Sequence, residues 1–321
     1  MKPKEILVFG ASGQIGRHLI RKLTKNNYKV VAVTRNIHQK GYILKTQANP
    51  GYLEIVELPY FNIEKINNLL DECSICINLV GILFEKRKNY FKNIHTDFPD
   101  LLSKLSAEKN IEKLIHISSL GIEKSLDSNY AISKLEGENK VKKNFDRVVV
   151  LKPSIVYSVD DNFTTNFMTL LNRLPIMPLY YEGKTKFAPI HVTDLVQIIF
   201  DVVQDKVNEQ TIECIGPEIL SFKEIILKLL KTIDKKRLLI PLPLALAKLS
   251  AKIFEIMPNP LVTVDQINLL KYDNTPSGNY KTNFDLGLGA NRIFEKEIEK
   301  YSFNWRDGGQ YTREKFLKNN K

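Results

Sequence analysis

The chain has 321 residues, 43% of them hydrophobic and 26% charged, so it can bury a full core and is not a disordered tail. Its formal net charge of +11 favours acidic partners such as a nucleotide or an anionic membrane surface. The basic residues are spread along the sequence without a compact basic motif, so we expect no nucleic-acid partner.

Hydropathy and cysteine usage bear on the compartment. No stretch approaches the roughly 18 consecutive apolar residues that cross a bilayer, and a strand pattern starts too close to Met1 to leave room for a secretory signal. Three cysteines cannot form an even disulfide framework, which favours a reducing, cytoplasmic compartment. Cys73 and Cys76 form a CxxC pair, but Cys76 falls in the apolar run ICINLVG, so we expect core thiols. We predict no metal site, because the histidines also lack metal-ligand spacing.

Short apolar runs alternate with helical patterns over the first half of the chain. These runs, rich in Ile, Val and Leu, cover residues 5–10, 29–34, 53–57, 74–80, 113–118 and 147–152. Nearly continuous apolar content, as in RVVVLK, is typical of strands that are covered on both faces. The sequence therefore predicts an α/β fold with a Rossmann-type, doubly wound parallel sheet.

The first strand leads directly into the glycine-rich segment GASGQIG, which opens an amphipathic helix. In this context, glycines three residues apart indicate a dinucleotide-binding loop. Gly10 would make the tight turn, Gly13 would let a pyrophosphate approach the backbone, and Gly16 would let the helix pack on the strand. The N–H groups and the dipole of the helix N-terminus would then hold the phosphates. The predicted cofactor contacts here are Gly10, Ser12, Gly13, Gln14, Ile15, Gly16 and Arg17.

The end of the second strand bears on which dinucleotide binds. An NAD site usually has an acid there that accepts the ribose hydroxyls, whereas this chain has Thr34 and Arg35 in the segment VVAVTRN. An arginine can pair with a 2′-phosphate, and Arg17 and Lys40 would add positive charge. We therefore favour NADP(H) as the cofactor, with NAD(H) as the alternative.

A second candidate site follows the fifth predicted strand, in the segment SSLGIEKSLDSNYAISKLEGE. Tyr130 and Lys134 are four residues apart, so both would project from one face of a helix. The lysine ammonium would lower the pKa of the phenol from about 10, and Tyr130 could then exchange a proton with a substrate oxygen during hydride transfer. Ser118, or its neighbour Ser119, would hydrogen-bond the same oxygen at the carboxyl end of the strand.

These motifs, with NLVGIL, LKPSIVYSVDDNF and FAPIHVTDL, resemble the extended and atypical short-chain dehydrogenase/reductase superfamily over nearly the whole chain. The segments INLVGILFE, GKTKFAPIHVTDLVQII and MPNPLVTVDQINLLKYDN are most similar to the nucleotide-binding accessory subunits of respiratory complex I and their bacterial relatives. The resemblance implies that Ser118 aligns with the family's serine, beside Tyr130 and Lys134. It also implies that Asn78 and Gly81 line the nicotinamide side of the cofactor cleft.

The resemblance also implies a role. Members of this branch hold NADPH firmly, lie against the peripheral arm of complex I near the membrane surface, and are regarded as structural. The Tyr/Lys pair is often degraded in that branch, yet Tyr130 and Lys134 are both present here. Three functions therefore stay open: an accessory or assembly component of a respiratory NADH:ubiquinone oxidoreductase, a free NADPH-dependent reductase, epimerase or dehydratase, and a regulatory nucleotide-binding protein. We favour the first, with complex I subunits and the inner face of a bacterial plasma membrane as partners.

The regular alternation of strands and helices breaks after Pro153. We expect one nucleotide-binding domain and one smaller lobe that binds a substrate or a partner. The expected nucleotide-binding domain comprises residues 1–154 and 186–216, and the expected lobe comprises residues 155–185 and 217–321.

Within the smaller lobe, the segment PLALAKLSAKIFEIMP predicts an amphipathic helix over residues 243–257. Its apolar face is wide and includes Leu246, Leu249, Ile253 and Ile256, beside one narrow polar stripe. A face of this width must be covered. It can pack within its own lobe or dock on a membrane or a partner subunit, and the sequence leaves these alternatives open.

Overall fold

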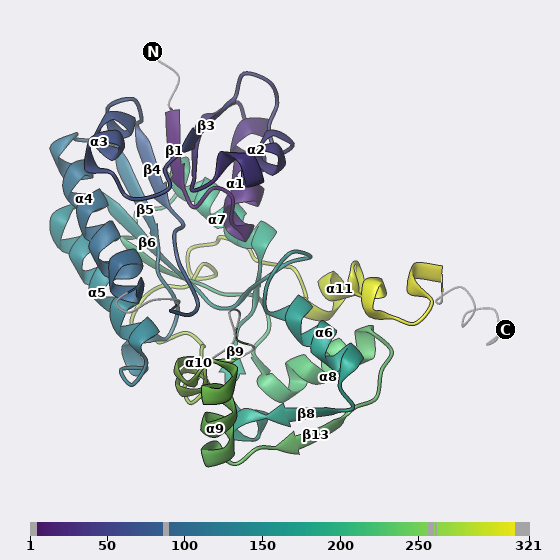
Figure 1. The fold of residues 1–321 in the computed structure, drawn as a ribbon. Helices are drawn as coiled ribbons and strands as arrows, with labels where there is room; N and C mark the ends of the chain where they lie inside the picture. Colours follow the sequence, from purple (N-terminus) through teal and green to yellow (C-terminus); the bar gives the residue numbers. More distant parts are fainter. Residues whose placement is uncertain (1–4, 86–89, 256–259, 261, 312–321) are drawn as a thin grey trace. The chain divides into compact units, whose positions relative to one another are not determined.

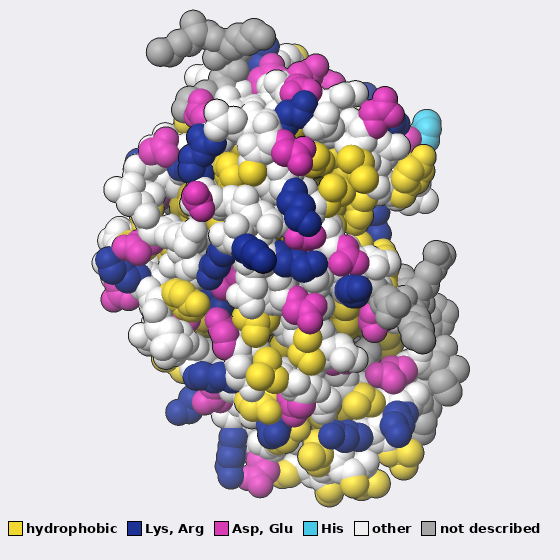
Figure 2. All heavy atoms as spheres, turned by 90° about the vertical axis from the view of Figure 1, so that its left-hand side faces the viewer, with side chains coloured by type: hydrophobic (Ala, Val, Ile, Leu, Met, Phe, Trp, Pro, Cys, Tyr) yellow, Lys and Arg dark blue, Asp and Glu magenta, His cyan; other side chains and the backbone are white. Residues whose placement is uncertain are grey.

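The computed structural model describes residues 5–85, 90–255, 260 and 262–311, and the chain divides into two compact units (Figure 1). Unit 1 comprises Met1–Pro153, Val192–Cys214 and Pro276–Gly289. Unit 2 comprises Ser154–His191, Ile215–Thr275 and Ala290–Lys321. On the face drawn in Figure 2, basic and acidic side chains are interspersed, in agreement with the scattered charges of the sequence.

A seven-stranded sheet forms the centre of unit 1, and all its neighbouring strands are parallel. Its strands are β1 (Glu5–Phe9), β2 (Lys29–Thr34), β3 (Leu53–Glu57), β4 (Ile75–Asn78), β5 (Lys113–Ile117), β6 (Val148–Pro153) and β11 (Thr211–Cys214). The order β11-β6-β5-β4-β1-β2-β3 confirms the predicted doubly wound sheet, and all six expected runs form strands. The strand order reverses between β1 and β4, and ligands of such sheets bind beyond the carboxyl ends of the strands at this switch point.

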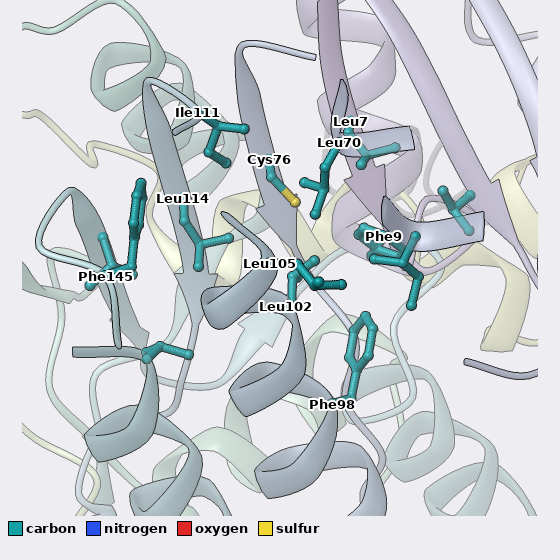
Figure 3. Packing of buried hydrophobic residues seen from close by; sticks show 14 of the residues in the cluster. Leu7, Phe9, Leu70, Cys76, Phe98, Leu102, Leu105, Ile111, Leu114 and Phe145 are labelled. Carbon is teal, nitrogen blue, oxygen red and sulfur yellow. The ribbon is translucent and has the colours of Figure 1, made fainter. Parts of the chain in front are cut away.

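Helices cover both faces of this sheet (Figure 1). One face carries α3 (Ile63–Asp71), α4 (Phe98–Glu108) and α5 (Asn129–Asn144), and the other carries α1 (Gln14–Lys25), α2 (Ile37–Lys45) and α7 (Val192–Val203). Figure 3 shows Phe98 and Leu105 of α4 in one buried cluster with Phe9, Cys76 and Leu114 of the strands. Because both faces are covered, the central strands are apolar throughout, as the sequence predicted.

Local capping explains where several helices begin. The side chains of Asn36, Asn62 and Ser128 each accept a backbone N–H from the first turn of α2, α3 and α5, respectively. Before α4, the chain makes a π-helical turn, η1 (Lys92–Asp97), a feature that is frequent at functional sites. The expected core thiol Cys76 is fully buried in β4.

The third segment of unit 1, residues 276–289, corrects a predicted boundary. The sequence assigned these residues to the smaller lobe, but they lie beside β11. The Glu213 N–H donates to the Lys281 carbonyl, and the Asn283 N–H donates to the Glu213 carbonyl, each at 3.0 Å. The segment has too little regular structure to show a periodic pattern, so this pairing could not be predicted from the sequence.

Residues 186–191 were also assigned to the wrong unit, in this case to the nucleotide-binding domain instead of unit 2. Phe187 forms a bridge with Asn274, and Ile190 pairs with Val156, both within unit 2. Strands of two residues are set by such long-range pairing and carry no signal of their own.

Unit 2 is built from short strands and helices. Its strands are β7 (Val156–Tyr157), β8 (Ile176–Leu179), β9 (Lys186–Phe187), β10 (Ile190–His191), β12 (Leu220–Ser221) and β13 (Leu238–Pro241). Its helices are α6 (Thr164–Arg173), α8 (Phe222–Thr232), α9 (Leu244–Phe254), α10 (Val264–Leu269) and α11 (Phe294–Glu299). The main cluster of buried apolar residues in this unit packs α6, α8 and α11 together.

Helix α9 corresponds to the amphipathic helix expected over 243–257. Leu246 and Leu249 of its predicted apolar face are both exposed, while Ile256 and the side chain of Ile253 lie outside the described residues. Within the described ranges, each helix is too short or too polar to cross a membrane.

Candidate functional site

The glycine-rich segment forms a tight loop between β1 and α1, and two of its glycines are required by backbone packing. Gly10 has a φ of +77°, and a methyl group there would lie 3.0 Å from the Leu79 carbonyl carbon. A methyl group at Gly16 would lie only 2.4 Å from the Ala11 carbonyl oxygen, which no real side chain tolerates. Gly13 is exposed, and its N–H donates to the Gly10 carbonyl at 3.0 Å. The loop thus has a tight turn, a close approach to the helix and an exposed glycine at the positions that the sequence predicted.

The start of α1 has the chemistry of an anion site. The first turn of a helix leaves backbone N–H groups without acceptors inside the helix, and the helix dipole is positive there. Gly13 occupies the N-cap position and has no side chain that could cover these groups. Gln14 and Ile15 follow, both half-buried. The Thr34 hydroxyl donates to Ser12 Oγ at 3.3 Å, which ties the loop to the end of β2. These residues fit a dinucleotide whose pyrophosphate lies against the loop.

Two arginines bear on this loop: Arg17 lies in the first turn of α1, and Arg35 follows the end of β2. Arg35 is exposed and directly follows Thr34, the residue that contacts the loop. Its guanidinium donates to the Tyr90 hydroxyl at 3.3 Å. Arg17 is half-buried on α1, and its Nε donates to the Gly13 carbonyl at 3.3 Å. The guanidinium of Arg35 therefore follows directly after Thr34, the residue of β2 that contacts the loop.

Tyr130 and Lys134 lie one turn apart at the start of α5, as predicted. The Tyr130 ring is half-buried and stands edge-on to the His95 ring, with 5.3 Å between the ring centroids. Lys134 is buried, and its Nζ donates to the Ile117 carbonyl at the end of β5 at 3.1 Å. The helix start and the strand end thus hold this pair at the carboxyl edge of the sheet.

The environment of Lys134 brings its ammonium close to titration. Burial lowers the pKa of Lys134 from 10.5 to about 8, although the negative charge of Glu138 opposes this shift. A methyl group at Gly81 would lie 3.3 Å from Lys134 Nζ. Gly81 itself is exposed, and its lack of a side chain leaves room beside the buried ammonium on the side of the loop after β4. Gly81, one of the two residues that the resemblance implied for the nicotinamide side, thus lies beside Lys134.

His95 connects this loop to α5. Its Nε2 accepts the backbone N–H of Ile82 at 3.1 Å, so the proton of the neutral ring is on Nδ1, which lies 3.0 Å from Ser133 Oγ. Burial, together with the positive charge of Lys134, lowers the pKa of His95 to about 2, so the ring stays neutral. His95 is therefore a positioning residue that fixes the loop beside Lys134.

Asn78 differs from the expectation. The resemblance implied that it lines the cofactor cleft, but the side chain is only 1% exposed. Its Nδ2 lies 3.1 Å from His116 Nδ1, and its Oδ1 accepts the backbone N–H of Val80 at 3.1 Å. Both polar atoms of the amide therefore have partners. The oxygen accepts a backbone N–H in the turn after β4, and the nitrogen lies beside a histidine of the neighbouring strand. Asn78 therefore stabilises the turn after β4 from a buried position.

Ser118 also differs from the prediction that it holds a substrate oxygen. It is buried, and its hydroxyl donates to Glu138 Oε2 at 2.8 Å. Ser118 therefore faces α5, where Glu138 lies. Ser119 is half-buried. Of the two serines that the sequence proposed, Ser119 is the more accessible.

Glu138 is the centre of a buried ionic network in unit 1. Its carboxylate accepts from Lys142 at 2.7 Å and lies 3.3 Å from the ammonium of Lys152, a side chain with 0% exposure. Lys152 also pairs with Glu123. The Tyr280 ring lies 5.1 Å from both ammonium groups. Burial alone would raise the pKa of Glu138, but Lys152 and Lys142 hold it below its usual value.

The sequence contained part of this signal, although the prediction missed it. Four residues at intervals of four form one stripe along α5. They are Tyr130, Lys134, Glu138 and Lys142. Lys152 is a cation within the apolar run RVVVLK, which also calls for a buried counter-charge. Tyr280 gave no such signal, because it comes from a distant segment of the chain.

Comparison with known families agrees with this geometry. Residues 6–215 match the model of the NAD dependent epimerase/dehydratase family. The chain belongs to this family. The match includes the glycine loop, β4, β5 and α5, so this NAD-dependent epimerase/dehydratase family member has the part of the fold in which the family binds NAD(P).

Two relatives extend the likeness over most of the chain. One is the mitochondrial NADH-ubiquinone oxidoreductase 40 kDa subunit of Neurospora crassa, which is 23% identical over 283 residues, or 88% of this chain and 74% of that protein. The other is subunit 9 of the mitochondrial NADH dehydrogenase (ubiquinone) 1 alpha subcomplex from Dictyostelium discoideum, which is 27% identical over 295 residues, or 91% of this chain and 82% of that protein.

A solved structure shows the same fold in another member of the epimerase/dehydratase type. DesIV, a dTDP-glucose 4,6-dehydratase from Streptomyces venezuelae crystallised with NAD and TYD bound, superposes with a TM-score of 0.70. It is 16% identical, and the superposition covers 94% of this chain and 96% of DesIV. At this identity, the likeness concerns the fold alone.

Proposed function

We propose that this chain is an accessory or assembly subunit of a respiratory NADH:ubiquinone oxidoreductase that holds a dinucleotide as a structural ligand. The observation that carries this proposal is the extent of the likeness to respiratory subunits. The family match ends at residue 215, whereas the likeness to the Dictyostelium subunit covers 91% of this chain. It therefore includes much of unit 2.

The site geometry supports a structural ligand. The glycine loop keeps the turn and the close approach that a pyrophosphate needs, while Ser118 is committed to Glu138. A ligand that binds only the folded chain stabilises it, by about 2.7 kcal/mol when its concentration is 100 times the dissociation constant. A bound dinucleotide would thus stabilise unit 1 without any turnover.

We expect this dinucleotide to be NADP(H). Arg35 follows the contact between β2 and the loop and can pair with a 2′-phosphate. Replacing Arg35 by Asp removes the cation and adds an acceptor for ribose hydroxyls, so the preference should shift toward NAD(H) by about tenfold or more. Fluorescence titration with NADPH and NADH measures the ratio, and Lys40→Gln, a change of an exposed cation on α2, is the control. An unchanged ratio in the Arg35 variant would place the phosphate elsewhere.

The decisive experiment for the accessory role is a native separation of membranes solubilised in mild detergent. The proposal predicts that the protein migrates with the large complex that carries NADH dehydrogenase activity, at the inner face of the plasma membrane in a bacterial cell. A protein that runs alone in the soluble fraction would contradict this role. Deletion of the gene should then lower the amount of assembled complex rather than remove a soluble reductase activity.

A second function is favoured by one observation, the intact Tyr130 and Lys134 pair on α5. In this alternative, the chain is a free NADPH-dependent reductase, epimerase or dehydratase. Tyr130 would exchange the proton, Lys134 would stabilise the phenolate, and Ser119 would bind the substrate oxygen in place of Ser118.

The variant Tyr130→Phe separates the two functions. In an enzyme, loss of the phenol should lower turnover by a factor of about 100 or more, whereas in an accessory subunit it should leave the assembled complex at its normal level. The readouts are a substrate screen with NADPH and the native separation. Loss of the complex in this variant, with unchanged folding and dinucleotide affinity, would contradict the passive role that we give to Tyr130.

A further inference from the structure

Unit 2 exposes large aliphatic side chains on one continuous stretch of chain, residues 238–249, and on the strand that pairs with it. We call these residues the apolar face: Ile176, Leu238, Ile240, Leu244, Leu246 and Leu249. On the two-stranded ribbon of β8 and β13, Leu238 stands opposite Ile176. An exposed strand face is normally polar, so a row of aliphatic residues there calls for a covering partner.

Helix α9 begins three residues after the end of β13 and carries further exposed leucines. Its inner side is marked by Ala247 and Ala251, which are buried against Tyr180. Leu246 and Leu249 lie on the opposite side of the helix and are 54% and 58% exposed. Small residues thus face the unit and large aliphatic residues face away from it, which reverses the usual pattern of a surface helix.

The charged residues along this stretch are mostly basic, with the acids Asp234 and Glu255 at its two ends. Every charged residue from 235 to 252 is basic. They are Lys235, Lys236, Arg237, Lys248 and Lys252. Lys235 pairs with Asp307, whereas Lys248 and Lys252 flank Leu249 on the helix.

We propose that the apolar face binds the surface of an anionic lipid bilayer. A protein interface is typically depleted of lysine and enriched in aromatic residues, methionine and arginine. This face has leucine and isoleucine beside four lysines and one arginine, Arg237. A second copy of the chain is disfavoured, because an isologous contact would bring the two basic rims together. Aliphatic side chains with flanking lysines match a layer of acyl chains beneath anionic headgroups.

The length of α9 limits how deeply the apolar face can enter the bilayer. Helix α9 has 11 residues, which suits a helix that lies in the plane of the headgroups, not one that spans the membrane. The proposal rests on the peripheral location proposed above, and it does not depend on the dinucleotide, because all the residues concerned belong to unit 2.

Sedimentation of the purified full chain with vesicles tests the proposal. The chain should bind vesicles of phosphatidylcholine mixed with phosphatidylglycerol and should be released by high salt, because the lysines act through the surface potential. The double variant Leu246→Ser and Leu249→Ser should lower binding by at least tenfold. Lys248→Gln with Lys252→Gln should lower it by about fivefold per lysine, which corresponds to about 1 kcal/mol each.

Matched control variants lie on another helix of the same unit. Leu227 on α8 is 46% exposed and Lys223 is also exposed there, so Leu227→Ser and Lys223→Gln should leave vesicle binding unchanged. Equal binding to vesicles of phosphatidylcholine alone would overturn the anionic specificity. An absence of vesicle binding, with normal migration in the respiratory complex, would overturn the proposal. The apolar face would then be a contact for a protein partner, and the accessory role would be unaffected.

Discussion

The glycine loop and the start of α5 lie at the same edge of the sheet but are stabilised in different ways. The loop depends on backbone packing, since added methyl groups at Gly10 and Gly16 would meet neighbouring backbone atoms. The α5 side depends on buried charges, with Lys134 and Glu138 both enclosed in unit 1. The two halves of the candidate site therefore have separate physical supports. A change can therefore remove one and leave the other.

This separation also explains why the loop side alone suits a structural ligand. Backbone N–H groups do not titrate, so the phosphate contacts persist over a wide range of pH. The α5 side contains ionisable groups whose states depend on one another, and Ser118 is drawn into them through Glu138. Three changes test how far the two sides are independent.

The largest effect is expected for Glu138→Gln, which breaks the α5 side. Lys152 would keep only Glu123 and would stay buried, so we expect a loss of about 3 kcal/mol in the free energy of unfolding. Because the folded pKa of Glu138 lies below its usual 4.5, its contribution to stability is present above that pH and is lost as the pH falls. Urea unfolding at several pH values measures both effects.

Glu136→Gln is the matched control, because Glu136 is on the same helix and exposed. This variant should change the free energy of unfolding by less than about 0.5 kcal/mol. The folded Glu138 variant should still bind the dinucleotide within a few-fold of the original affinity. Full stability of Glu138→Gln would show that the network is not structural, and loss of binding in the folded variant would show that the two sides are coupled.

The next largest effect is expected for Gly16→Ala, which breaks the loop side. The residue is helical, so the methyl group does not strain φ, and the cost comes from its 2.4 Å approach to the Ala11 carbonyl oxygen. Overpacking of this kind costs about 1–3 kcal/mol, and displacement of the loop should lower dinucleotide affinity by at least tenfold. Urea unfolding and fluorescence titration measure these two quantities.

Gly41→Ala on α2 is the control for this change. A methyl group at Gly41 would lie 3.1 Å from Ile37 Cγ1, a side-chain atom that can move away. This variant should keep its dinucleotide affinity and most of its stability. If Gly16→Ala bound the dinucleotide as well as Gly41→Ala did, the close approach at Gly16 would have no part in binding.

Local patterns explain why much of this fold was predictable. The six apolar runs and the glycine loop are set by periodicity and by backbone sterics, both of which are properties of short segments. The pairing of Tyr130 with Lys134 follows from helical spacing for the same reason. Each of these predictions needs only residues that are close in the sequence.

The predictions that differed depend on residues that are far apart in the sequence. Ser118 is diverted by Glu138, and Asn78 by His116 on the neighbouring strand. The boundaries of the two units were wrong because residues 276–289 join β11 through backbone hydrogen bonds alone. The choice between Ser118 and Ser119 needed the burial and the hydrogen-bond partner of each side chain, which depend on the position of α5.

The smallest effect concerns the pH dependence of dinucleotide binding, and it measures the share of the α5 side in binding. Lys134 Nζ has three hydrogens, and one of them donates to the Ile117 carbonyl, which leaves donors for a ligand. The pKa of Lys134 is about 8, so the ammonium is present below this pH and is lost above it. Affinity for the dinucleotide should therefore fall by about tenfold as the pH rises from 7 to well above 8.

Two variants assign this pH dependence to Lys134. Lys134→Met should bind weakly at every pH, with a flat profile, while Tyr130→Phe should keep the original profile because it removes only the phenol. The charge of Lys134 also acts on folding. Its folded pKa lies below 10.5, so the unfolded chain binds more protons between pH 8 and 10.5, and this group makes the folded state more stable as the pH rises through that range. Affinity that falls while stability rises over the same pH range would identify Lys134 as a ligand contact, since a general loss of structure would lower both. An affinity that does not change with pH would confine binding to the glycine loop.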